Sequence, residues 1–270
     1  MTPATAAISI TEERTFSAKL NGRTVTGLAV ASAWEGFTKY TNAAGAHLIV
    51  LDAEQRVVTG SFDLVDQLGL TAPEAHLPFE LGAYIGGGYF AGIITVEGQR
   101  YALIVAGAEG ELRGTWHSST SRIEGAVSRR DGKANTLDME AAGSPLAKQA
   151  AALNIDGITD WYLPSRDELE LMYRAFKPTA QTNYADGEDG VNPNSVPVGL
   201  PYTKESPVQT TVENFRAGGA DALVDGWYWS STQHASSPSY AWVQYFYYGY
   251  QDDNHKSYEG RARAVRRLPI

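Results

Sequence analysis

The sequence predicts an α+β fold in which a small β-rich N-terminal domain, residues 1–76, precedes a larger mixed domain, residues 77–270. Near the N-terminus, two strand-like runs flank Asn21 and Gly22, a dipeptide typical of hairpin turns. Two apolar runs, 89–96 and 100–106, form a second predicted hairpin. Helix signals follow, and short strand-like segments then continue to the last residue, so helices and strands share the larger domain.

Helices are predicted from their N-terminal capping signals. A serine followed by a proline opens the segment 144–153, with the proline at the first helical position. Ser165 and Glu168 form the capping-box pattern and open a helix over 165–176. A shorter helix is expected over 61–68. The polar segment after residue 176 has no sustained period up to about residue 226, so we expect a functional or disordered loop there.

Composition excludes several classes of protein. The chain carries 22 Lys and Arg against 31 Asp and Glu, a net charge of −9, which argues against nucleic-acid binding because phosphate recognition needs a basic face. It contains no cysteine, which excludes disulfides, thiol catalysis and thiolate metal sites. The start lacks a basic region followed by an apolar run, and no apolar stretch reaches the roughly 18 residues of a membrane span. We therefore expect no membrane insertion, and a location in a virion or in the cytoplasm without a standard secretion signal.

Candidate metal ligands gather in one glycine-broken loop. Asp186, Glu188, Asp189, Asn192 and Asn194 offer the oxygen ligands that calcium prefers, although a solvated turn explains the same residues equally well. The histidines form no metal-binding pair, and no hydroxyl lies in a motif that supplies a general base. We expect no enzyme activity and no cofactor, with calcium as the single weak candidate.

Aromatic residues are concentrated near the C-terminus. Of the 32 residues in 227–258, 11 are aromatic, and most of the others are Ser, Asp, Asn, Gln or His. If 241–247 is a strand, one face carries Trp242 and Phe246 toward the core and leaves Tyr245 and Tyr247 outward. The polar run that follows reads as a loop. Exposed tyrosine among small polar residues is typical of paratopes, because tyrosine gives a large contact area at low entropic cost.

Four segments together resemble a known family: 160–165 (DWYLPS), 229–232 (WSST), 241–246 (AWVQYF) and 261–266 (RARAVR). They resemble the C-type-lectin-like domain of the Lcl C-terminal type, which is shared by variable proteins of diversity-generating retroelements. The resemblance covers residues 79–270, and the segment 131–136 also fits its early part. It implies a fold of small antiparallel sheets with two helices. It also implies that adenine-directed mutagenesis diversifies the C-terminal segment, residues 227–268.

The resemblance sorts that segment by residue type, because adenines randomised in Asn-type codons yield residues that include Tyr, Ser, Asp, Asn, His, Phe and Gly but not Trp, Gln, Lys or Glu. The implied scaffold residues are Trp229, Trp242, Gln244, Gln251 and Lys256. The implied ligand-binding, variable positions are His234, Ser236, Ser239, Tyr240, Tyr245, Tyr247, Tyr248, Tyr250, Asp252, Asp253, Asn254, His255, Ser257 and Tyr258. The expected core residues are Trp161, Leu163, Trp229, Trp242, Phe246 and Val265.

The function that the resemblance implies is receptor binding through a hypervariable tyrosine-rich face, similar to that of the phage major tropism determinant. The expected partner is a protein or glycan on a bacterial cell surface. Residues 1–76 would attach the chain to a virion, and the protein is expected to be a homotrimer. Two alternatives stay open: a carbohydrate-binding lectin-like protein of fixed specificity, and a structural virion protein without its own ligand. The calcium-lectin signatures Glu-Pro-Asn, Gln-Pro-Asp and Trp-Asn-Asp are absent.

Overall fold

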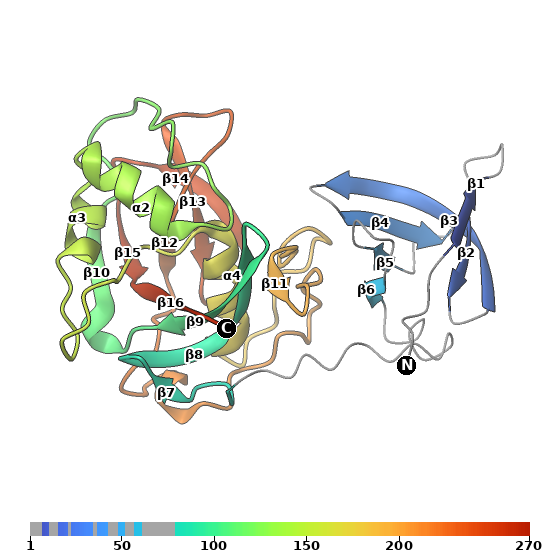
Figure 1. The fold of residues 1–270 in the computed structure, drawn as a ribbon. Coiled ribbons are helices and arrows are strands. Elements are labelled where there is room, and N and C mark those ends of the chain that lie inside the picture. Colours follow the sequence, from blue (N-terminus) through green and yellow to red (C-terminus); the bar gives the residue numbers. More distant parts are fainter. Residues whose placement is uncertain are drawn as a thin grey trace. The chain divides into compact units, whose positions relative to one another are not determined.

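The chain divides into two units, Met1–His76 and Leu77–Ile270 (Figure 1). The computed structural model describes residues 79–270 throughout and, in the first unit, the six strands that lie between Ala7 and Gly60. The helix predicted over 61–68 falls outside the described residues.

The strands of the first unit form one antiparallel sheet in which each strand pairs with its neighbour in the chain. Leu20 pairs with Arg23 across the first long hairpin. The turn predicted at 21–22 lies outside the described residues. The strand order is therefore sequential, and all pairings are local. The strands are β1 (Ala7–Ile10), β2 (Phe16–Leu20), β3 (Arg23–Trp34), β4 (Phe37–Asn42), β5 (Leu48–Leu51) and β6 (Val57–Gly60).

The second unit contains two five-stranded sheets and three α-helices. One sheet has the order β10-β15-β12-β13-β14, and the other has β11-β8-β9-β16 with β7 paired to β8. The strands are β7 (Tyr84–Ile85), β8 (Gly88–Val96), β9 (Gln99–Val105), β10 (Glu111–Thr115), β11 (Ser195–Val196), β12 (Trp227–Gln233), β13 (Tyr240–Tyr245), β14 (Gln251–His255), β15 (Glu259–Arg263) and β16 (Val265–Pro269). The helices are α2 (Gly132–Ala141), α3 (Pro145–Ala151) and α4 (Arg166–Phe176), and two short 3₁₀ turns are η1 (Ala108–Gly110) and η2 (Glu213–Phe215). The mixed α+β class is therefore confirmed.

The predicted hairpin of the second unit is strands β8 and β9, in which Val96 pairs with Gln99. Glu97 and Gly98 form the turn with φ of 49° and 77°. Positive φ at both central residues gives a backbone twist that matches that of the flanking strands. The chain returns to this sheet at its end, because β16 pairs with β9 through Val265 and Val105.

Two of the three helices begin at the predicted caps. Ser144 caps α3, and the Ser165 N–H donates a 2.8 Å hydrogen bond to Oε2 of Glu168 to complete the capping box of α4. The expectation of two helices was wrong, because α2 is also present. Asp131 caps α2 through the N–H of Ala134. The buried side chains of α2 are mostly small or polar, so the sequence carries no apolar stripe that would reveal this helix.

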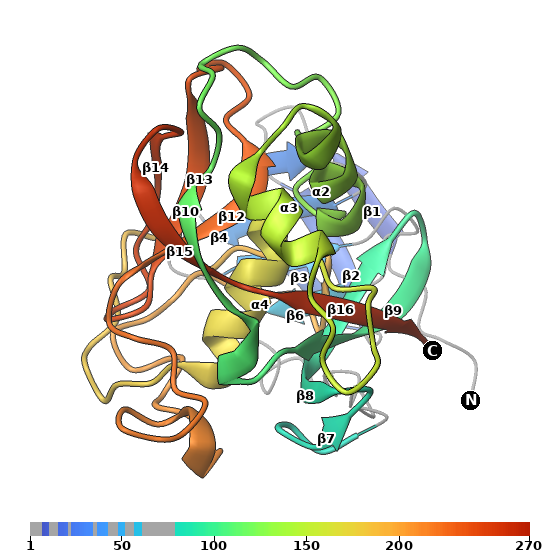
Figure 2. The ribbon, with the colours of Figure 1, turned by 90° about the vertical axis from the view of Figure 1, so that its left-hand side faces the viewer.

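The helices cover both faces of the sheet that contains β12 and β13. Helices α2 and α3 pack side by side against β12 and β10, as Figure 2 shows, whereas α4 packs against β12 and β13 and also against β8 of the other sheet. Trp229 and Val243 belong to the core on the α2 and α3 side, and Tyr228 and Phe246 to the core on the α4 side. The interior of the sheet is therefore buried on both faces.

Trp161, Leu163, Trp229, Phe246 and Val265 are buried as predicted, but Trp242 is not. The parity argument assumed that only one face of 241–247 is buried. Both faces are covered, so Ala241 and Val243 fill the core on one side, and Gln244 and Phe246 are buried on the other. Trp242 lies closer to the start of β13 than Gln244 and Phe246 do, and it is only half-buried.

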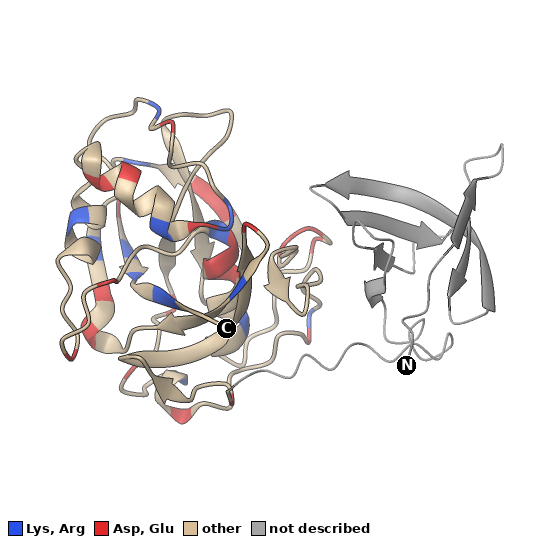
Figure 3. Cartoon of the chain, viewed as in Figure 1, with Lys and Arg blue, Asp and Glu red and all other residues tan. Residues whose placement is uncertain are grey.

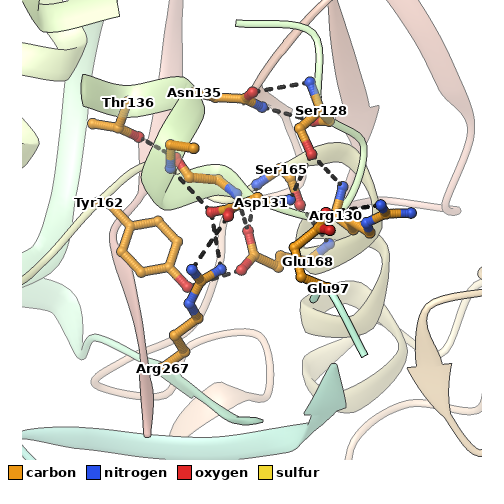
Figure 4. Close-up of polar contacts among 12 residues, drawn as sticks. Glu97, Ser128, Arg130, Asp131, Asn135, Thr136, Tyr162, Ser165, Glu168 and Arg267 are labelled. Carbon is orange, nitrogen blue, oxygen red and sulfur yellow. Dashed lines mark hydrogen bonds and ion pairs between the residues drawn. The ribbon is translucent and has the colours of Figure 1, made fainter. Parts of the chain in front are cut away.

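A buried polar network joins the helices to the C-terminal strand (Figure 4). Oε2 of Glu168 accepts hydrogen bonds from the N–H groups of Ser165 and Gly132, and Oε1 accepts the Tyr162 hydroxyl at 2.8 Å. The Arg267 guanidinium pairs with Asp131 at 2.9 Å. This network fixes the first turns of α2 and α4 relative to each other and to β16.

Candidate ligand-binding site

The predicted variable positions lie at the surface of the second unit. None of them is buried, and Ser236, Tyr240, Ser257 and Tyr258 are exposed. Four of the five predicted scaffold residues are buried, and Trp242 is the exception. Strand β14 is the edge strand of the sheet and pairs with β13, and we call these two strands the edge ribbon. Members of both groups lie along the edge ribbon.

One end of the edge ribbon carries six mutually contacting aromatic rings, here called the tyrosine cluster. Tyr245 contacts Trp227 at 5.0 Å and Tyr248 at 5.0 Å between ring centroids. Most neighbouring rings meet at steep angles, such as 80° for Tyr245 and Tyr248. This geometry is favourable for aromatic pairs. The tyrosine cluster consists of Tyr184, Trp227, Tyr245, Tyr247, Tyr248 and Tyr250.

Tyr245, Tyr247, Tyr248 and Tyr250 were expected to be solvent-exposed, and each is half-buried. They bury one another and not the hydrophobic core, to which none of them belongs. Each ring therefore keeps part of its area free for a ligand. The pKa of the Tyr250 hydroxyl is raised, chiefly by the neighbouring Asp252 carboxylate, so this end of the ribbon is acidic.

Tyr184 reaches the tyrosine cluster from the long polar loop, and it is 44% exposed. Its N–H donates a 2.8 Å hydrogen bond to the carbonyl of Tyr248. The preceding Asn183 is buried, where Oδ1 accepts hydrogen bonds from the Tyr173 hydroxyl and the Lys177 ammonium. The segment predicted as a functional or disordered loop is thus anchored by buried polar groups and places an aromatic ring at the site.

The other end of the edge ribbon groups histidine and tyrosine side chains. Tyr240 pairs with His255 across the strands, and their rings meet at 5.5 Å and 89°. His255 also contacts Tyr258, which is 58% exposed. His234 lies 5.5 Å from the Trp242 ring. Because side chains alternate along a strand, Tyr240 and His255 project from the face opposite to that of Tyr245. The predicted positions therefore occupy both faces of the edge ribbon.

The Arg166 guanidinium stacks on the Trp242 ring at 3.7 Å from its centroid. Arg166 is the first residue of α4, and its N–H donates to Oγ1 of Thr232 on β12, which fixes its backbone beside the ribbon. Burial, with repulsion from Arg129, lowers the pKa of the Arg166 guanidinium to about 10, so it stays charged at neutral pH. This contact also explains why Trp242 does not join the core.

The buried scaffold residues hold the edge ribbon to the loops that flank it. The Gln244 amide donates to the Tyr202 hydroxyl at 2.9 Å, and Oε1 of Gln251 accepts the Gly190 N–H at 3.2 Å. The Lys256 ammonium donates to the carbonyl of Ser121 at 3.0 Å. These contacts come from buried side chains, so residues other than the predicted variable positions hold the backbone of the site.

The stretch from 248 to 255 was expected to be a polar loop, but Gln251–His255 is strand β14. An edge strand needs only one hydrogen-bonding neighbour and one packed face, so it tolerates polar residues throughout. Figure 3 shows acidic residues on β14 and on α4. The backbone of the predicted variable positions 252–255 consequently forms an ordered ladder with β13.

The weak calcium candidates do not converge on an ion position. Oδ1 of Asp186 accepts the N–H groups of Glu188 and Asp189, and Oδ2 of Asp189 accepts the Gln251 N–H. Asn192 donates to the Glu170 carboxylate at 2.7 Å. These oxygens and amides stabilise the loop itself. Within the described residues, no group of three acidic or histidine side chains is arranged to hold a metal ion.

Three residues of the site escaped the sequence reasoning. Tyr184 lies in a distant loop, and only the fold brings it to the tyrosine cluster. Trp227 was counted among the aromatic residues but not assigned to the site, although it contacts Tyr245 and Tyr250. Arg166 carries a single signal, its place in the capping-box segment, which says nothing about its side chain.

Comparison with known proteins places the second unit in a family. In the described part of the chain, no helix has the length and apolar character of a membrane span. No curated protein matches the sequence. The family model of the Lcl C-terminal domain matches residues 112–266, which is more than half of the chain and includes α2, α3, α4 and the edge ribbon. The chain therefore belongs to the Lcl C-terminal domain family, whose domain is C-type-lectin-like.

Proposed function

We propose that the protein is a receptor-binding protein of a phage tail, which binds a protein or glycan on a bacterial cell surface through the edge ribbon and the tyrosine cluster. The observation that carries this proposal is the separation of side chains along β13 and β14. Every predicted variable position is at least partly exposed, whereas Gln244, Gln251 and Lys256 among them are buried. Membership of the Lcl C-terminal domain family supports a tropism-type role.

The chemistry of the exposed side chains suits recognition better than catalysis. Tyr, Asp, Asn and His supply most of the exposed side chains of the edge ribbon, and Ser236 and Ser257 lie just outside its strands. Tyrosine supplies rigid, amphipathic contact area, and the small polar residues supply adaptable hydrogen bonds. Because the framework contacts come from other residues, the exposed set can change without loss of the fold. This separation supports diversification by a retroelement. A nearby reverse transcriptase gene, with an almost identical repeat downstream that differs at adenines, would test that part of the proposal.

The first unit has no role in this site in our proposal, and we assign to it attachment to the virion. A homotrimer fits this arrangement, because linked copies of a weak site gain avidity of about 10²–10⁴. Sedimentation of the full chain tests the trimer. A monomer at tens of micromolar would contradict it.

The direct test replaces Tyr245, Tyr247, Tyr250, Asp252 and His255 together by Ser in the full chain. The expected result is a nearly unchanged melting curve, because none of these side chains is in the core. Adsorption to a panel of bacterial cells should be lost, because truncation of central aromatic residues removes most of the binding energy. The framework control is Trp229→Ser, which should unfold the second unit.

Each other outcome points to a different reading. A folded variant that still adsorbs would place the binding site elsewhere on the chain. A variant that fails to fold would make these side chains structural and would favour a virion protein without its own ligand. Competition of wild-type adsorption by simple soluble sugars would favour a carbohydrate-binding protein of fixed specificity.

A further inference from the structure

The Arg166 guanidinium forms no hydrogen bond or ion pair with a described residue, although the charges of Asp167 and Asp189 act on it. Its Nε is buried and has no hydrogen-bond partner, and its two Nη atoms donate to no residue that the structure describes. The Asp167 carboxylate pairs with Arg129 and not with Arg166, and it also accepts a hydrogen bond from Asn194. The guanidinium is thus held by its stacking on Trp242 and by the fixed backbone of α4.

A half-buried cation without an ionic partner is poorly solvated, and an incoming anion relieves that deficit. Because Nε is enclosed, the anion meets the terminal nitrogens, whose planar geometry matches the two oxygens of a carboxylate. The surroundings include Asp189, whose charge acts on Arg166, and Asp253, which pairs with Trp242 across the ribbon. This acidic setting opposes a divalent phosphate more strongly than a monovalent carboxylate.

We infer that Arg166, stacked on Trp242, is a fixed anion-binding point within the proposed binding face and pairs with the carboxylate of an Asp or Glu side chain on a protein ligand. This inference rests on the proposed function. Trp242 and Arg166 lie beside predicted variable positions but are not among them, so the same anchor would serve every variant of the face.

The described contacts favour a protein ligand over an acidic sugar. A sugar ring binds by stacking on an open aromatic face, but Arg166 covers one face of Trp242, and His234 contacts the same indole. The rings of Tyr240 and His255 meet edge to face, as do those of Tyr184 and Tyr250. A side-chain carboxylate needs only the edge of the guanidinium, which forms no hydrogen bond with a described residue.

The experiment titrates the full chain with a short polyglutamate peptide, a polyglutamine peptide of equal length, and trigalacturonate as a carboxylate-bearing sugar. We expect polyglutamate to bind, with a shift of the Arg166 Nε–H resonance, and polyglutamine not to bind. Arg166→Gln should weaken polyglutamate binding by about tenfold, the amount expected for a charge-assisted hydrogen-bonded pair. The polyglutamate affinity of Arg166→Lys should fall between those of the wild type and Arg166→Gln, because lysine keeps the charge but lacks the planar guanidinium.

The matched control is Arg113→Gln, which removes one positive charge from an exposed position of β10, the strand at the opposite edge of the same sheet. It should change polyglutamate affinity less than twofold. An equal loss in both variants would reduce the effect to net charge and overturn the inference. Absence of polyglutamate binding at millimolar concentration would overturn it too. Stronger binding of trigalacturonate would overturn the assignment to a protein side chain.

Cell adsorption separates this inference from the proposed function. If the Ser-substituted variant loses adsorption and Arg166→Gln keeps it, the site stands and the anchor fails. If the Ser-substituted variant keeps adsorption, the proposed function itself fails, whatever the peptide titration gives. Melting curves establish that Arg166→Gln is folded. Were it unfolded, Arg166→Lys and the Arg166 resonance of the wild-type chain would decide.

Discussion

The ammonium of Lys256 lies 4.6 Å from the centroid of the Trp116 ring and is fully buried, whereas its neighbour Ser257 is exposed. Lys256 also donates hydrogen bonds to the carbonyl of Ser121 and to the side chain of Gln233. One residue therefore ties the end of the edge ribbon to the loop after β10, and the next is free to contact a ligand. Framework and face positions can thus be direct neighbours in the sequence.

Lys256→Met should destabilise the second unit by about 2–4 kcal/mol, because it keeps the aliphatic stem but leaves buried acceptors without their charged donor. The free energy of unfolding in urea measures the effect. The matched control is Ser257→Ala at the adjacent exposed position, where a change within about 0.5 kcal/mol is expected. Equal destabilisation by the two substitutions would show that the framework position and the exposed position contribute equally to stability.

Trp229 and Trp242 should respond differently to truncation, although both are tryptophans of the same sheet. Trp229→Ala removes a fully packed core side chain and should cost about 3–5 kcal/mol. Trp242 is half-buried under Arg166, so Trp242→Ala should cost less than half as much, chiefly through the lost cation–π contact. Paired urea titrations check this. A larger loss for Trp242→Ala would return that residue to the core.

Local signals in the sequence were enough to predict much of the fold. The capping box of Ser165 and Glu168, the Ser144 cap and the β8–β9 turn each depend on residues within a few positions, and each is confirmed. Helix α2 and strand β14 escaped, because the hydrophobic period that reveals an element is absent where small or polar residues fill it.

The site was predictable only as far as residue type reports exposure. Tyr, Ser, Asp, Asn and His at the predicted variable positions indicated surface positions, and none of these positions is buried. The partners of these residues come from elsewhere: Tyr184 from the long loop and Arg166 from the start of α4. Such contacts join residues far apart in the chain, and no period or motif encodes them. For the same reason Trp242 was wrongly assigned to the core.

Glu168 should tolerate amide substitution far better than truncation. A glutamine can turn its oxygen to the N–H groups of Ser165 and Gly132 and its amide group to the Tyr162 oxygen, so each buried contact keeps a partner. Glu168→Ala leaves three buried polar groups unsatisfied and should cost about 3 kcal/mol or more. Melting curves of the two variants test this. Similar losses would show that the carboxylate charge, and not the hydrogen-bond pattern, holds the network.

Asp189 should make the second unit less stable as the pH rises toward neutrality. Burial raises the pKa of its carboxyl from 3.8 to about 6, and the charges of Asp186 and Asp252 add to the shift, against the hydrogen bond from the Gln251 N–H. Between these two pH values the folded state holds a proton that the unfolded state has released. The contribution of Asp189 to stability is therefore fully present below 3.8 and is lost as the pH rises through about 6. Asp189→Asn keeps an acceptor for Gln251 and removes the titration, so its unfolding free energy should fall less across this window than that of the wild type. Asp225→Asn, at an exposed position, is the control and should follow the wild-type profile. Urea titrations on both sides of the window measure the difference, and parallel curves for wild type and Asp189→Asn would show that this carboxyl is already ionised at low pH in the folded protein.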